Sequence, residues 1–146
     1  MRFRTLAALV VAAMAASVTT SSAQETRQYI NGRSASQTDA PPFSGAVLVG
    51  NTLYLSGVLG GPATATAEAA ARAALDSMKG TLEAAGMTMD DLVSVQVFAS
   101  DLADYGGFNT AYRSYFTREF PARAFLGAGT LLNNARFEVI GIAVKR

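Results

Sequence analysis

The stretch Ala63–Gly86, ATATAEAAARAALDSMKGTLEAAG, decides the fold class because its apolar residues repeat with the period of an α-helix. The apolar face comprises Ala67, Ala70, Ala71, Ala74, Met78, Leu82 and Ala85. Most charged residues fall elsewhere around the helix. Gly86 stands where helices commonly end in a left-handed residue. So many alanines on one face predict a helix that lies close against a β-sheet.

The residues before this helix predict strands. Gly45–Gly57 contains two short apolar runs on either side of Gly50-Asn51, a pattern typical of a β-hairpin. Gly57–Gly61 is predicted to be a flexible exit loop. A weak edge strand is expected around Gln28–Gly32, followed by a loop that contains Pro41-Pro42, because proline disfavours strand pairing.

The residues after the helix complete the pattern. Leu92–Ala99 alternates between apolar and polar residues as a strand does. A second helix is expected with Asp104 as its N-cap and with its end at Phe120-Pro121. Ala122–Gly129 and Arg136–Val144 are predicted as the last two strands. The order predicts an α+β fold, with one mixed β-sheet and two helices on one face.

The outer face of such a sheet predicts self-association. The last strand places Ile140, Ile142 and Val144, or the residues that alternate with them, on the side away from the helices. Both faces of the sheet are therefore apolar. An apolar face without a helix over it needs another cover, and a second subunit can supply it. We expect a homo-oligomer on these grounds.

The first residues have the features of a secretory signal peptide. Arg2 and Arg4 precede the apolar run Leu6–Ala16, and small residues follow up to Ala23. The alternative is an uncleaved membrane anchor, but the run is shorter than the roughly 20 residues that span a bilayer. We expect cleavage after about Ala23, a single domain over residues 24–146, and a periplasmic or secreted protein that does not associate with membranes.

Composition excludes several classes of function. The 146 residues include no cysteine and no histidine, which removes disulfides, Cys-His and Ser-His-Asp catalysis and the usual zinc sites. Loss of Arg2 and Arg4 leaves ten basic and eleven acidic residues, so the basic surface that nucleic-acid binding needs is not expected. Asp90-Asp91 is read as a solvated turn. No metal or cofactor is predicted.

Six segments in one order resemble the RidA/YjgF family of reactive imine deaminases. These are Leu55–Gly57, Ala84–Gly86, Val97–Leu102, Phe108–Tyr112, Phe120–Arg123 and Glu138–Val144, and the resemblance covers about residues 42–145. The resemblance implies a chorismate-mutase-like homotrimer with ligand clefts between subunits. It also implies hydrolysis of 2-imino and enamine acids to 2-keto acids and ammonia. The partners it implies are a small carboxylate or imino acid and other copies of the chain.

The resemblance also implies roles for particular residues. Arg123 would hold the substrate carboxylate with its planar guanidinium and serve in catalysis. Asn109 and Ser56 would contact the substrate, as would the backbone amides near Phe125. Ile140 stands where the family's deaminases usually have glutamate. Phe43, Val58 and Phe125 replace a tyrosine, a glutamine and a cysteine that are frequent in the family, and Phe43 and Ile140 are expected to line the substrate site.

Glu138 is the remaining catalytic candidate. It lies two residues before Ile140, so on a strand it faces the same way at about 7 Å along the chain. A structural or interfacial role is the alternative. Arg123 could likewise be a surface ion-pair partner, and Asn109 a local cap.

Three hypotheses about function therefore remain. One is an imine and enamine deaminase, in which water polarised by Asn109, Ser56 or Glu138 attacks a substrate held by Arg123. The second is a trimer that binds small carboxylates without turnover, and the third is a structural trimer without a ligand. Tyr105, Tyr112 and Tyr115 are read as packing residues in all three.

Overall fold

The computed structural model describes residues 26–32, 34, 36 and 38–146. The predicted signal peptide, residues 1–23, lies outside the described residues. Within the described part of the chain, no helix is both long and apolar enough to cross a membrane.

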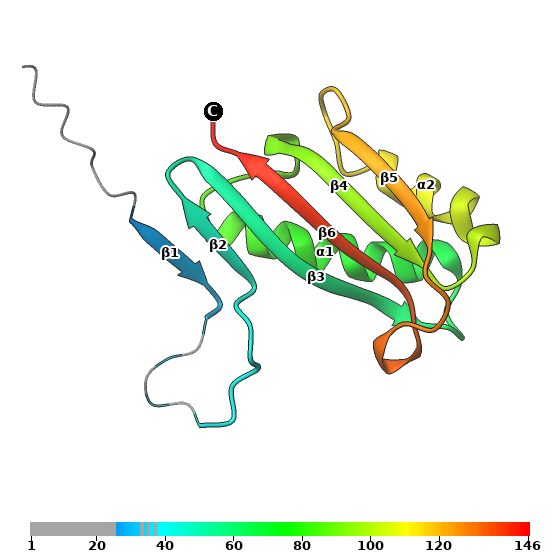
Figure 1. The fold of residues 1–146 in the computed structure, drawn as a ribbon. Coiled ribbons are helices and arrows are strands. Elements are labelled where there is room, and N and C mark those ends of the chain that lie inside the picture. The colour runs from blue at the N-terminus through cyan, green and yellow to red at the C-terminus, as the bar shows by residue number, and fades with distance from the viewer. Residues whose placement is uncertain (1–25, 33, 35, 37) are drawn as a thin grey trace, which may run out of the picture.

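The described residues form one six-stranded sheet with two α-helices packed on one side of it (Figure 1). The strands are β1 (Arg27–Ile30), β2 (Ala46–Val49), β3 (Thr52–Pro62), β4 (Leu92–Ala99), β5 (Ala122–Gly127) and β6 (Ala135–Val144), and the helices are α1 (Ala67–Ala84) and α2 (Tyr105–Arg113). The strand order is β1-β2-β3-β6-β4-β5. Only β4 and β5 pair in parallel among these neighbours, so the sheet is mixed and the predicted α+β architecture is confirmed.

Helix α1 confirms the prediction from the alanine-rich stretch. It begins after Thr66, whose side-chain oxygen accepts a hydrogen bond from the backbone N–H of Ala69 at 3.2 Å. It ends before Gly86, which has a φ of +70°. A Cβ atom on Gly60 would lie 2.5 Å from the carbonyl oxygen of Ala70. The alanines therefore bring the helix into direct backbone contact with β3.

The prediction of an exit loop at Gly57–Gly61 is wrong. These residues belong to β3, and Leu59 and Gly60 pair with Glu138 and Phe137 of β6. The register shifts between Leu55 and Val58, which marks a β-bulge. Glycines in this segment permit the bulge and the close approach of α1, although the same glycines suggest a loop when only the sequence is considered.

Helix α2 is shorter than predicted, whereas its start confirms Asp104 as the N-cap residue. It ends at Arg113 instead of near Phe120. Asp104 does not cap it with its side chain, because its carboxylate pairs with Arg136 at 2.5 Å. Asp101 is the capping side chain of the preceding 3₁₀ turn and accepts from the backbone N–H of Ala103 at 2.9 Å.

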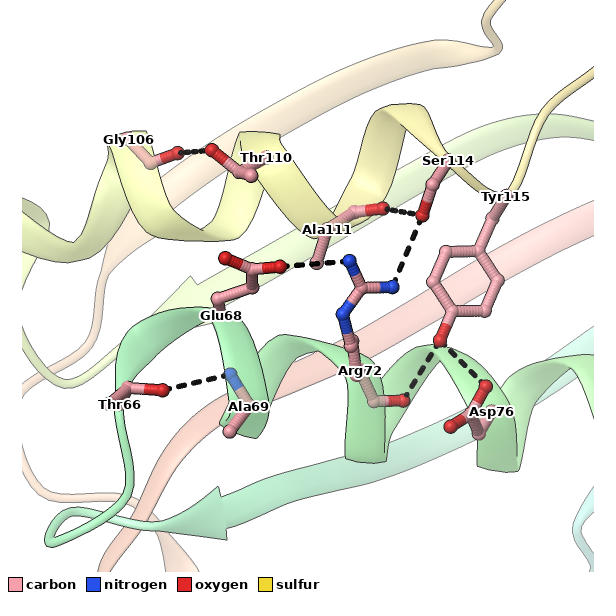
Figure 2. A network of polar contacts seen from close by, with 10 residues as sticks. All are labelled: Thr66, Glu68, Ala69, Arg72, Asp76, Gly106, Thr110, Ala111, Ser114 and Tyr115. Atoms are coloured by element: carbon pink, nitrogen blue, oxygen red, sulfur yellow. Dashed lines mark hydrogen bonds and ion pairs between the residues drawn. The ribbon is translucent and has the colours of Figure 1, made fainter.

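A polar network ties the C-terminal end of α2 to α1 (Figure 2). Arg72 donates to Glu68 at 2.8 Å and to the hydroxyl of Ser114 at 3.3 Å. The Tyr115 hydroxyl donates to Asp76 at 2.6 Å. Burial and then this hydrogen bond raise the pKa of Tyr115 to about 12. The network fixes the position of α2, which carries the residues of the candidate site.

Asp90 and Asp91 lie in a 3₁₀ turn, Met89–Asp91, so the predicted turn is confirmed, but both carboxylates are only partly exposed and make hydrogen bonds within the chain. Asp91 accepts from the backbone N–H of Thr88 at 2.7 Å and from its hydroxyl at 3.0 Å. Asp90 accepts from the backbone N–H of Thr117 at 3.0 Å and from its hydroxyl, and these bonds lower the pKa of Asp90. The pair therefore joins the start of β4 to the segment that follows α2.

The two faces of the sheet differ in how completely they are covered. On the helix side, Phe137 and Val139 of β6 are fully buried. On the opposite side, which we call the bare face, Ile140, Ile142 and Val144 of the same strand are half-buried. The prediction that both faces are apolar is confirmed, and the bare face has no helix over it (Figure 1).

Candidate functional site

Arg123 lies near the start of β5 with its side chain on the helix-covered side of the sheet. Its Nη2 donates to the side-chain oxygen of Asn109 at 2.7 Å. The guanidinium carbon lies 4.5 Å from the ring centre of Tyr112, 5.6 Å from that of Phe108 and 5.8 Å from that of Tyr105. Three aromatic rings and one amide thus fix the direction of the cation.

Local sequence explains this arrangement. Tyr105, Asn109 and Tyr112 are spaced by four and three residues on α2, so they share one face of the helix. Arg123 pairs with Val95 of β4, whose side chain is buried on the helix side. Phe125 is two residues further along β5 and faces the same way. Its ring packs edge to face on the ring of Tyr105, with 5.1 Å between the ring centres, so it holds the Tyr105 side chain in place.

These residues surround a pocket of about 290 Å³, which we call the Arg123 pocket. It is lined by Tyr105, Asn109, Tyr112, Arg113, Phe120, Pro121 and Arg123. Aromatic walls with a cationic end suit a small organic anion. The sequence predicts packing roles for Tyr105 and Tyr112 and does not indicate that Phe120 lines a pocket. The spacing of Tyr105, Asn109 and Tyr112 was the available signal for the shared face.

The electrostatics of the pocket favour a bound anion. Among the described residues, no carboxylate pairs with Arg123 within 4.0 Å. A hydrogen bond from Asn109, and then the positive charge of Arg123, lower the pKa of the Tyr105 phenol. Burial raises the pKa of Tyr112 to about 12, and its hydroxyl has no hydrogen-bond partner among the described residues. The two tyrosines on the same cation therefore differ in their readiness to give up a proton.

The other predicted site residues lie elsewhere in the protomer. The Ser56 hydroxyl donates to the backbone oxygen of Ser44 at 2.6 Å, so its proton is already engaged. Phe43 precedes Ser44 and is 61% exposed. The carboxylate of Glu138 lies over Gly57, where any side chain would collide with it. Phe43, Ser56 and Glu138 are therefore grouped around β3 and away from Arg123.

The sheet separates Arg123 from Glu138 and Ile140 within one protomer. Glu138 and Ile140 alternate with the buried Phe137 and Val139, so they project from the bare face. Strand β4 also lies between β5 and β6. The structure thus groups Arg123, Asn109 and Phe125, and it leaves Ser56, Phe43, Glu138 and Ile140 outside that group.

Ile140 lines a second hollow, on the bare face. This hollow has a volume of about 230 Å³ and is lined by Tyr54, Leu55, Ser94, Gln96, Ile140, Gly141 and Ile142. Its lining carries no charged side chain. Within the described residues, no group of three or more Asp or Glu side chains is placed to hold a metal ion.

Comparison with known proteins is consistent with this geometry. The family described as Endoribonuclease L-PSP matches residues 35–145. A Dermatophagoides farinae protein named 2-iminobutanoate/2-iminopropanoate deaminase is 38% identical, over 70% of this chain and 85% of that protein. The human protein of the same name is 34% identical, over 71% of this chain and 80% of that protein.

A solved structure shows the same fold. The YjgF gene product of Escherichia coli superimposes with a TM-score of 0.68 at 34% identity, covering 72% of this chain and 89% of that one. With the family match over residues 35–145, the conclusion is direct: the chain belongs to the Endoribonuclease L-PSP family, which is the RidA/YjgF family that its sequence resembles.

Proposed function

We propose that this protein hydrolyses small 2-imino and enamine acids to 2-keto acids and ammonia, with Arg123 as the carboxylate anchor. The observation that carries the proposal is the guanidinium of Arg123, which is held in a pocket and has no carboxylate partner among the described residues. The names of the relatives support the reaction class. A pocket of about 290 Å³ fits a small acid better than a polynucleotide, so we favour deamination over RNA cleavage.

Anchoring by Arg123 leaves the reacting atoms close to the pocket mouth. One Nη of the guanidinium donates to Asn109, and the remaining N–H groups can donate to a carboxylate in a planar, forked arrangement. Asn109 is therefore a positioning residue for Arg123. The imine carbon next to the carboxylate then lies among Tyr105, Tyr112 and Phe120, where water can add to it.

We further propose that the working unit is a homotrimer, in which one copy brings Ser56 and Glu138 to the Arg123 pocket of the next. Two observations support self-association: the uncovered apolar residues Ile140, Ile142 and Val144, and the sheet that separates Arg123 from Glu138 in a single protomer. A carboxylate can polarise water for attack only if a second copy supplies it to this pocket.

The activity test uses a 2-imino acid formed in place by an amino-acid oxidase acting on 2-aminobutanoate. The wild-type chain should raise the rate of 2-oxobutanoate release above the spontaneous rate. Arg123→Ala should lower kcat/KM by about a hundredfold or more, since charge-assisted hydrogen bonds contribute about 1.5–3 kcal/mol each. Arg27→Ala, which removes the same charge from the exposed strand β1, is the matched control and should retain activity.

A second candidate function is a non-catalytic carboxylate binder. The apolar Ile140 favours it, because this side chain stands where the deaminases that the sequence resembles usually have glutamate and it cannot transfer a proton. Calorimetry with 2-oxobutanoate and with a short aromatic acid separates the two functions. Binding that depends on Arg123, without any release of keto acid above the spontaneous rate, would replace the deaminase proposal with this one. Gain of deamination in Ile140→Glu would show that only a carboxyl group had been missing.

Export is a further part of the proposal. The basic start, the short apolar run and the small residues before Ala23 support cleavage and a periplasmic or secreted protein. Mass measurement of the protein from cells that carry the full-length gene tests this directly. An intact Met1 would contradict export by cleavage.

A further inference from the structure

Tyr105 occupies the mouth of the Arg123 pocket in a fixed position. It is the first residue of α2, and its side chain is about half exposed. Its ring packs edge to face on Phe125 at 5.1 Å, and its ring centre lies 5.8 Å from the guanidinium carbon of Arg123. A carboxylate held by that guanidinium would place the neighbouring imine carbon and nitrogen beside this phenol.

A relay of polar groups joins the Tyr105 phenol to the anchor. The Asn109 oxygen accepts from Arg123, which leaves the amide NH₂ of Asn109 free to donate. Asn109 donates to the Tyr105 oxygen, and with the charges of Arg123 and Arg113 it lowers the pKa of that phenol. Each of these groups stabilises the deprotonated oxygen of Tyr105. On the same helix, burial instead raises the pKa of Tyr112 to about 12.

We infer that Tyr105 is a catalytic residue that exchanges protons with the substrate nitrogen and with the attacking water. This inference rests on the proposed deaminase function and adds the group that handles protons. The other candidates are less suited within the protomer. The Tyr112 hydroxyl is buried, the Ser56 proton is engaged by Ser44, and Glu138 projects from the bare face.

The inferred chemistry has two proton cycles. In the first, the Tyr105 phenol gives its proton to the imine nitrogen while the water oxygen bonds to the imine carbon and the C=N electron pair moves to nitrogen. The phenolate then takes one proton from the added water, which yields a neutral carbinolamine and restores the phenol.

In the second cycle, the phenol protonates the amine nitrogen, the C–N bond breaks and its electron pair leaves with ammonia. The hydroxyl oxygen forms the carbonyl as its proton returns to the phenolate. Imine and water are thereby converted to keto acid and ammonia, with Tyr105 unchanged.

The test is Tyr105→Phe, which removes the hydroxyl and keeps the ring that packs on Phe125. We expect kcat for the 2-imino acid to fall about a hundredfold with little change in KM, since general acid–base groups contribute about 10²–10⁴. Circular dichroism of the variant should match that of the wild-type chain. Tyr29→Phe makes the same chemical change on the exposed strand β1, outside the pocket, and should keep kcat within about twofold of wild type.

The pH dependence provides a readout that a purely structural role would not change. The wild-type kcat should fall on the alkaline side as the phenol of Tyr105 ionises at a pKa below its ordinary 10. This limb should be absent in Tyr105→Phe. Ultraviolet difference titration of wild type against Tyr105→Phe should show one phenol with a lowered pKa.

The outcomes separate the two proposals. An active wild-type chain with an unchanged kcat in Tyr105→Phe would overturn the role of Tyr105 and leave the deaminase function standing. A wild-type chain that releases no keto acid above the spontaneous rate would overturn both.

Discussion

The two faces of the sheet are built from alternate residues of the same strands, yet they differ in what completes them. On one face, α1 and α2 cover Phe137 and Val139 without leaving either exposed. On the bare face, Ile140 and Ile142 remain half exposed. The comparison indicates that a single chain supplies the whole of one core, whereas it leaves the other apolar surface without a cover of its own.

The comparison also bears on the candidate site. The Arg123 pocket belongs to the covered face, where a helix and an edge strand fix its geometry within one chain. Glu138 belongs to the bare face, where it lies over Gly57. An anchor and a carboxylate on opposite faces can act together only through assembly. Substitutions that disrupt one face of the sheet and leave the other intact therefore test this distinction.

The largest effect on stability is expected for Phe137→Ala. Phe137 is fully buried and packs against Phe108 at 4.9 Å between ring centres. Its loss should cost about 3–5 kcal/mol in the free energy of unfolding. Ile140→Ala on the same strand should cost much less in the monomer. Urea denaturation of both variants measures the difference, and equal losses would contradict the distinction between the faces.

A smaller loss is expected for Gly60→Ala, which tests the close approach of α1 to the sheet. The added Cβ would meet the Ala70 carbonyl oxygen and the Ala74 side chain. Overpacking of this kind costs about 1–3 kcal/mol. Gly80→Ala on α1, where a Cβ would meet nothing within 4 Å, is the control and should not destabilise. A neutral Gly60→Ala in thermal denaturation would mean that the helix can move away easily.

Tyr112→Phe should increase stability by about 1 kcal/mol, because it removes a buried hydroxyl that has no partner among the described residues. It should also weaken the alkaline loss of stability. The folded-state pKa of Tyr112, about 12, lies above the ordinary 10, so the unfolded chain loses its proton first and stability falls between pH 10 and 12. Thermal denaturation across that range measures both effects, and a destabilised variant would show that the hydroxyl has a partner.

The smallest effect on the monomer fold, about 0.5 kcal/mol, is expected for Ile142→Glu on the bare face. Its effect on assembly should be large, because a charge would be buried against another subunit. Light scattering should give a trimer mass for the wild-type chain and a monomer mass for Ile142→Glu. A monomeric wild-type chain would contradict the proposed trimer.

Local patterns predicted the regular parts of the fold well. The helical period of α1 and the hairpin about Gly50-Asn51 arise from contacts between neighbours in sequence, and both are present. The course of β3 through Gly57–Gly61 could not be predicted, because those glycines serve a bulge and an approaching helix that only the tertiary structure reveals.

The site was only partly predictable for the same reason. Arg123 and Asn109 were named from a family resemblance, and the structure places them in contact at 2.7 Å. The sequence predicts only a packing role for Tyr105, because its phenol becomes a polar partner only when α2 lies against β5. The opposite directions of Arg123 and Glu138 likewise depend on strand order and pleat, which residue types do not specify.

The most direct test of the account is a crystal structure of the chain with 2-oxobutanoate, the keto acid expected from 2-iminobutanoate. The account predicts the carboxylate against the guanidinium of Arg123, with the keto carbon beside the Tyr105 phenol and with Glu138 of a second copy across the pocket. A ligand bound elsewhere, or an Arg123 pocket that another subunit fills without leaving room for an acid, would contradict it.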